Sequence, residues 1–266
     1  MADATRRVFR DVALLAGKDL RLEAKSRVGL AQVLPFGVLV LVVMAFALDA
    51  ESRLLIEVSP GLFWVTVTFA AVLTVGRSAA LEIEPGVDDA LRLSGIAPMA
   101  MFLGKWIAVA VQLLVLEAVL VAAMAVLYRT PLSGPALGIA TMVTATAGIA
   151  AVGTLLAALA STTRGRESLI PLLTLPVLAP VLIGATRATD VALGGSDGTG
   201  GWPWVALLGV FALSYVSLGA LPYRPLLEAS LQLLEPFRPP LSDPTPHRHP
   251  ARPPPAHSAS SSASTA

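Results

Sequence analysis

The chain has 266 residues, of which 55% are apolar and only 14% are charged, and its mean hydropathy is +0.73. A soluble domain of this length needs more charge to cover its surface, so the composition indicates a membrane protein. The absence of cysteine excludes disulfides, thiolate chemistry, iron–sulfur clusters and cysteine-ligated zinc sites.

The first stretch of sequence, from Thr5 to Arg27, combines an apolar stripe with a charged stripe at helical spacing. This pattern predicts an amphipathic helix that lies in the headgroup plane with its apolar side toward the lipid. A charged helix in water is the alternative interpretation. We assign residues 1–28 to this cytoplasmic elbow helix.

Six segments satisfy the requirement for a spanning helix, which is about 20 mainly apolar residues. These are Gly29 to Leu48, Gly61 to Leu81, Phe102 to Leu127, Ala136 to Ala160, Leu169 to Thr186 and Trp202 to Leu221. The sequence therefore predicts an all-α, polytopic membrane protein with a six-span domain over residues 29–221. Residues 222–266 form a Pro- and Ser-rich tail whose composition cannot offset the entropy of ordering, so we expect it to be disordered.

The positive charges lie unevenly on the two sides of these spans. Sixteen of the 19 Lys and Arg residues fall in the N-terminal segment, the second and fourth interspan loops and the tail, and only Arg53, Arg129 and Arg187 fall on the other side. Cytoplasmic loops carry the excess of Lys and Arg. We therefore expect both termini in the cytoplasm.

The long loop between the second and third spans contains acidic residues, a Pro-Gly break and a short helix-forming stretch with unburied leucines. Such a helix suits a docking element for a soluble partner, and it equally suits an interfacial helix that lies on the lipid. The candidate docking residues in this segment, about residues 82–98, are Glu82, Glu84, Gly86, Leu91, Leu93 and Pro98.

Four further candidates lie within spans. Glu117 is an acid near the middle of the third span, where an ionisable group is costly and therefore either functional or a hydrogen-bonded tie between helices. Pro171, Pro176 and Pro180 interrupt the backbone hydrogen bonds of the fifth span. They favour either a moving gate or a static bend.

Several activities find no support in these residues. A phosphate-binding loop needs the pattern G-x-x-x-x-G-K-[ST], and the nearest candidate, at Gly104 and Lys105, lacks the first glycine and the hydroxyl residue. We expect neither catalytic residues nor a metal site, and no bound cofactor. All three histidines lie in the tail, so no membrane-embedded histidine can ligate heme.

Three stretches carry a resemblance to a known family. They are GKDLRLEAKSR at Gly17 to Arg27, GRSAALEIE at Gly76 to Glu84, and GTLLAALASTTRGRESLIPLLTLPVLAPVLIGA at Gly153 to Ala185. The loop with its acids and the Gly-Lys pair resembles ABC-2-type permeases, and the three stretches together resemble the heme exporter protein B (CcmB) family of cytochrome c maturation. The resemblance runs from about Lys18 to about Leu221.

This resemblance implies a permease subunit of an ABC-type heme exporter in c-type cytochrome biogenesis, with heme as the possible cargo. ATP would act only through a separate ABC ATPase subunit docked on the 82–98 segment. Other implied partners are a heme-handling membrane protein, a small single-span subunit and a periplasmic heme chaperone, in the bacterial inner membrane, with a homodimer of this chain. Membrane lipids are expected as partners, and nucleic acid is not.

Two other functions remain open at this stage. One is an ABC-2 permease for another cargo, such as a lipid-linked glycan or a drug. The other is a membrane assembly factor that does not transport. A secondary transporter is disfavoured, because such folds carry paired broken helices and midplane charges, and here only Glu117 qualifies.

Overall fold

The computed structural model describes residues 2–26, 28–48, 53–81, 97–129, 133–160, 166–195 and 200–220. Every regular element in these ranges is an α-helix, which confirms the predicted all-α class. The helices are α1 (Ala2–Ser26), α2 (Val28–Ala47), α3 (Arg53–Leu81), α5 (Pro98–Leu127), α6 (Pro135–Ala160), α7 (Arg166–Ala192) and α8 (Trp202–Ala220).

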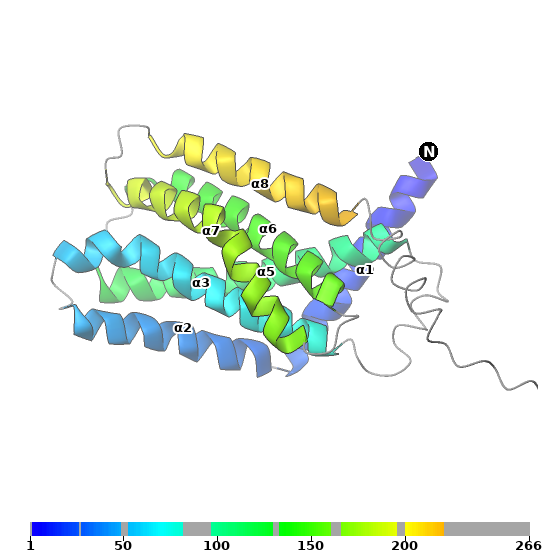
Figure 1. Ribbon diagram of the computed structural model, residues 1–266, viewed down its shortest axis with the longest axis horizontal. Helices are drawn as coiled ribbons and strands as arrows, with labels where there is room; N and C mark the ends of the chain where they lie inside the picture. The colour runs from blue at the N-terminus through cyan, green and yellow to red at the C-terminus, as the bar shows by residue number, and fades with distance from the viewer. Residues whose placement is uncertain are drawn as a thin grey trace, which may run out of the picture.

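Six of these helices run side by side as a bundle, and α1 crosses the bundle at one end (Figure 1). Helices α5 and α6 are the most central, because α6 packs against α3, α5, α7 and α8, and α5 packs against α1, α2, α3, α6 and α8. Helix α1 packs chiefly on α5. The arrangement brings the C-terminal ends of α2, α5 and α7 to the end of the bundle opposite α1 (Figure 1).

Within the described residues, five helices are long and apolar enough to cross a membrane: Leu54–Gly76, Met99–Leu127, Pro135–Leu159, Leu172–Ala192 and Trp202–Ala220. A shorter apolar helix covers Val33–Ala47. Their outward faces carry large apolar side chains such as Phe46, Val126 and Leu213, as a lipid-facing surface requires. The chain is therefore a multi-pass membrane protein.

Helix α3 begins at Arg53, although the hydropathy pattern predicts a start at Gly61. The predicted start was wrong, because the helix extends eight residues further toward the N-terminus. Pro60 has no N–H to offer the Ile56 carbonyl one turn earlier. The Ser59 hydroxyl donates to that carbonyl at 2.8 Å instead, so the helix continues through the proline.

Helix α7 ends at Ala192, six residues beyond the predicted Thr186. Arg187 and Asp190 lower the hydropathy of this last part, but its other face is apolar. Ala188 and Ala192 pack in a small buried cluster with Leu137 of α6 and Val205 of α8, which stabilises the extension.

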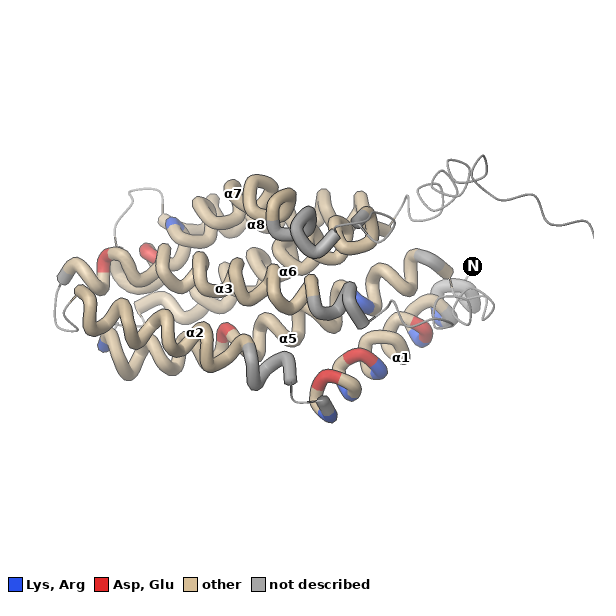
Figure 2. Tube along the Cα trace, turned by 60° about the horizontal axis from the view of Figure 1, so that its bottom comes forward, with Lys and Arg blue, Asp and Glu red and all other residues tan. Residues whose placement is uncertain are grey.

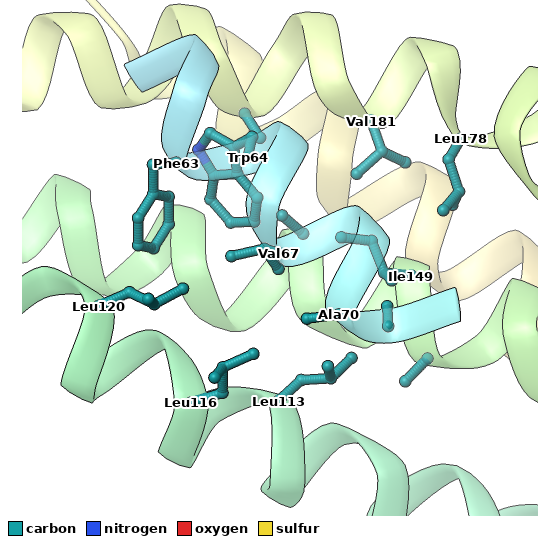
Figure 3. Close-up of a cluster of buried hydrophobic side chains, with 14 of the residues drawn as sticks. Phe63, Trp64, Val67, Ala70, Leu113, Leu116, Leu120, Ile149, Leu178 and Val181 are labelled. Atoms are coloured by element: carbon teal, nitrogen blue, oxygen red, sulfur yellow. The ribbon is translucent and has the colours of Figure 1, made fainter. Parts of the chain in front are cut away.

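The main core lies between α3, α5, α6 and α7 (Figure 3). Trp64 is fully buried and meets Phe63 edge to face, with ring centroids 5.2 Å apart. Leu113, Leu116 and Leu120 of α5 line the facing side. Several threonine hydroxyls in this apolar interior donate to carbonyls of their own helices, as Thr68 does to Trp64 at 2.8 Å, which satisfies those hydroxyls. Among the described residues, Thr154 Oγ1 and Glu117 Oε2 are buried without a hydrogen-bond partner.

Candidate functional site

The predicted docking segment lies mostly outside the described residues. Glu82, Glu84, Gly86, Leu91 and Leu93 all fall in the undescribed range 82–96. Pro98 is the first residue of α5, after Ala97 in an extended conformation (φ −63°, ψ 132°). Proline suits this position because the first N–H of a helix has no intrahelical partner. The third predicted span thus begins at Pro98 and not at Phe102.

Helix α1 lies against the part of α5 that follows this segment. Val12 and Ala16 are buried, and Gly104 of α5 permits the close approach of the α1 backbone: a β-carbon there would lie 3.4 Å from the Ala16 nitrogen. Gly104 and Lys105 are thus interior residues of the α5 helix. One face of α1 is occupied by the bundle.

The remaining surface of α1 carries both apolar and charged side chains. Phe9, Leu14 and Leu22 are more than half exposed, and Lys18 pairs with the neighbouring Asp19 at 3.1 Å. Charged residues gather along α1, whereas the bundle helices are largely without them (Figure 2). Helix α1 therefore exposes both apolar and charged side chains outside the surface that packs on α5.

Glu117 lies in the core of the bundle. Its side chain is fully buried, and the Thr146 hydroxyl of α6 donates to Oε1 at 2.5 Å. Oε2 has no hydrogen-bond partner among the described residues. Glu117 precedes the end of the Met99–Leu127 span by ten residues, which places it roughly 15 Å from that end of the helix.

A second polar contact joins the same two helices. The Trp106 indole N–H donates to the Ala147 carbonyl at 2.9 Å, so Trp106 and Glu117 of α5 reach adjacent residues of α6. Glu117 is a candidate predicted from the sequence, whereas Thr146 and Trp106 are not. Their signal was weak, because a threonine or tryptophan within a span has many other possible neighbours.

The three prolines are all incorporated in α7, which the structure shows as one helix. Pro176 and Pro180 lie on the exposed side, while Leu178 and Val181 form the buried side. Pro171 belongs to the same helix, but its side chain is outside the described set. The prolines are thus separated from Glu117, which bonds to α6.

Two hydrogen bonds between residues far apart in the sequence join helices toward the end of the bundle opposite α1. The Trp64 indole N–H donates to the Thr189 hydroxyl at 2.8 Å, joining α3 to α7. The Tyr128 hydroxyl donates to the Leu41 carbonyl at 2.8 Å, joining the end of α5 to α2. Neither of the two donors, Trp64 and Tyr128, is among the candidates predicted from the sequence. In the described ranges no three His, Cys, Asp or Glu residues come together as a metal site.

The described residues thus provide hydrogen bonds between helices and one buried acid, Glu117. Comparison with known proteins identifies the family. The family model described as CcmB protein matches residues 10–228. Heme exporter protein B of Paracoccus denitrificans is 26% identical over 215 residues, covering 77% of this chain and 92% of that protein.

Two more relatives of the same name agree. The protein from Rhodobacter capsulatus is 30% identical over 64% of this chain and 78% of its own length. The protein from Pseudomonas aeruginosa is 27% identical over 76% of this chain and 91% of its own length. The match covers the membrane helices from α1 to α8, confirms the resemblance found in the sequence, and shows that this chain belongs to the CcmB family.

Proposed function

We propose that this protein is the permease subunit of an ABC-type heme exporter complex that acts in c-type cytochrome biogenesis. The observation that carries this proposal is the match of the CcmB family model over residues 10–228. Relatives named heme exporter protein B align over 92% and 91% of their own length.

The proposal also covers the number of spans and the side of the membrane on which the termini lie. We infer six spans, with α2 as the first, because α2 has 20 residues, of which only Gln32 is strongly polar. Both termini lie on the cytoplasmic face of the bacterial inner membrane. Two observations support this orientation: sixteen of 19 Lys and Arg residues fall on one side of the spans, and Arg187 lies near the end of α7, away from α1.

Helix α1 acts as the elbow helix in this proposal. Val12 and Ala16 hold it on α5, and the exposed Phe9, Leu14 and Leu22 enter the headgroup region. The cations of α1 then meet anionic lipid. The pairing of α1 with the start of α5 places this helix next to residues that follow the 82–98 segment.

The energy source is a separate ABC ATPase that docks on the 82–98 segment. Glu82, Glu84, Gly86, Leu91, Leu93 and Pro98 are its proposed contacts. The chain itself is not the enzyme, since its family consists of heme exporter membrane subunits. Two copies of this chain, a heme-handling membrane protein, a small single-span subunit and a periplasmic heme chaperone complete the complex.

The cargo is the point on which the alternatives differ. The relatives carry a heme exporter name, and no feature of the described residues favours a lipid-linked glycan or a drug. The described residues contain no group suited to axial heme ligation beyond methionine and tyrosine. Met124 and Tyr128 are packed in the core, whereas Met99 is exposed at the start of α5. We name no heme ligand in this chain, and in this proposal heme contacts the complex through shape and through partner subunits.

The test is affinity purification of the full chain from its native membrane, followed by mass spectrometry of the proteins recovered with it. An ATPase together with heme-handling proteins is the expected result. An ATPase beside glycan or lipid enzymes would contradict the cargo, and recovery of no ATPase would contradict the permease role. Heme flux into vesicles that contain the purified complex separates transport from release of a chaperone without transport.

A further inference from the structure

Among the residues that the structure describes, the groups around Glu117 cannot balance a charge. Leu113, Leu116 and Leu120 flank it on α5, each at most 2% exposed. Helices α2 and α6, which both pack on α5, contain no ionisable side chain.

The other helices packed on α5 add no counter-charge at this depth. On α3 the described ionisable side chain is Glu57, which is exposed in the second turn of that helix, and Arg77 lies toward its other end. On α8 the ionisable group is Tyr215. Lys105 of α5 is twelve residues from Glu117, roughly 18 Å along the helix, and the charges of α1 lie beside Gly104.

Burial without a counter-charge among the described residues favours the neutral form of Glu117, although the hydrogen bond from Thr146 alone would favour the carboxylate. Thr146 donates to Oε1, while Oε2 meets no described donor or acceptor. An ionised carboxylate would therefore be a buried charge with one hydrogen bond and no cation, which costs several kcal/mol. Binding one proton removes that cost without any movement of the helices.

We propose that Glu117 is a proton-binding site in the bundle core, and that the contact between α5 and α6 controls its access to water. This proposal requires a second conformation, besides the one that the structure shows, in which α6 no longer covers the carboxyl. A proton is bound when Thr146 and Ala147 lie against α5, and it exchanges when the helices separate, so proton occupancy and helix separation are linked. The site does not depend on which cargo the complex carries.

Infrared spectroscopy of the purified full chain in lipid vesicles tests the bound proton. A neutral carboxylic acid has a carbonyl band separate from those of carboxylate and amide groups. We expect this band at neutral pH in the wild type and in Glu57→Gln, and its loss in Glu117→Gln. If the wild type lacks this carboxylic acid band at neutral pH, the proposed proton-binding site is wrong. This comparison uses the wild type alone, so it does not depend on any variant folding.

The Thr146→Val variant gives an independent signature. It keeps the shape of Thr146 but removes the donor to Oε1, so the acid band moves to higher frequency. A band that is unchanged in Thr146→Val belongs to another acid and overturns the assignment to Glu117.

Deuterium exchange of the same band tests the control of access. Trp106→Phe removes the second hydrogen bond between α5 and α6 and leaves the Glu117–Thr146 contact in place. We expect exchange to become roughly 2- to 10-fold faster, as loss of one hydrogen bond from the closed state predicts. Trp64→Phe is the matched control, because it breaks a bond between α3 and α7 and should leave the rate unchanged. Equal rates in Trp106→Phe and the wild type, or equal acceleration in both variants, overturn the control by α5 and α6.

Discussion

Gly104 of α5 and Leu15 of α1 approach so closely that a β-carbon on Gly104 would lie 2.8 Å from the Cβ of Leu15. Backbone atoms of α1 lie almost as near, with the Val12 carbonyl oxygen at 3.4 Å. A flexible side chain could give way to an added methyl group, but a backbone cannot. The close packing of α1 on α5 therefore depends on glycine at position 104.

Gly104→Ala is expected to push α1 away from α5 and to destabilise the protein by about 1–3 kcal/mol, as overpacking does. Thermal unfolding in detergent measures the change. Gly209→Ala in α8 is the matched control, since a β-carbon there meets nothing within 4 Å and alanine is the better helix former by about 1 kcal/mol. Equal effects of the two substitutions would contradict the close contact at Gly104.

The hydrogen bond from Trp64 to Thr189 is expected to stabilise the packing of α3 on α7. Trp64→Phe, Thr189→Val and the double variant form a cycle whose coupling free energy should be about 0.5–1.5 kcal/mol. Unfolding of the four proteins in the same detergent gives this value. Trp64→Phe combined with Ser214→Ala, which alters an exposed hydroxyl of α8, should be additive. If the effects of Trp64→Phe and Thr189→Val on the free energy of unfolding are additive, the hydrogen bond between these residues does not contribute to stability.

Leu91 and Leu93 are predicted to hold the ATPase on the 82–98 segment. The double variant Leu91→Ala/Leu93→Ala should fold normally but lose the ATPase in co-purification, because it removes the apolar surface of the docking helix. The control is Leu207→Ala/Leu213→Ala, which trims two exposed leucines of α8 and should retain the ATPase. Retention of the ATPase by the first variant would place the docking surface elsewhere.

Truncation after Pro236 is expected to be harmless, because the Pro- and Ser-rich composition beyond it cannot form a packed core. The amount of c-type cytochrome in cells that carry only the truncated chain is the measurement. Truncation after Gly201 is the informative comparison, since it removes α8, which packs on α6 and α7, and should abolish the protein. Loss of cytochromes in the first truncation would assign a role to the tail.

Much of the architecture could be read from hydropathy alone. A bilayer requires long uninterrupted apolar helices, so α5, α6 and α8 end where their apolar residues end, at Leu127, Ala160 and Ala220. The family could also be recognised, because the loop and proline-rich stretches retain its residues. Two of the wrong boundaries, the start of α3 and the end of α7, lie where the helix continues past Pro60 and past Arg187.

Those errors share one physical reason. Whether a helix continues past a proline or a charge depends on partners that local hydropathy does not reveal, such as the Ser59 hydroxyl on the Ile56 carbonyl or the packing of Ala188 and Ala192 against α6 and α8. The favourable contact outweighs the local preference, as tertiary packing commonly does.

The sequence by itself determined that the chain is a multi-pass helical membrane protein of the CcmB family with one acid inside a span. Only the tertiary structure decided what that acid meets. Thr146 lies 29 residues away from Glu117 along the chain, and nothing in the composition of α6 distinguishes Thr146 from its other threonines. Spans are set by the solvent around each helix, whereas the partner of a buried polar group is set by which helix packs against which, and at what register.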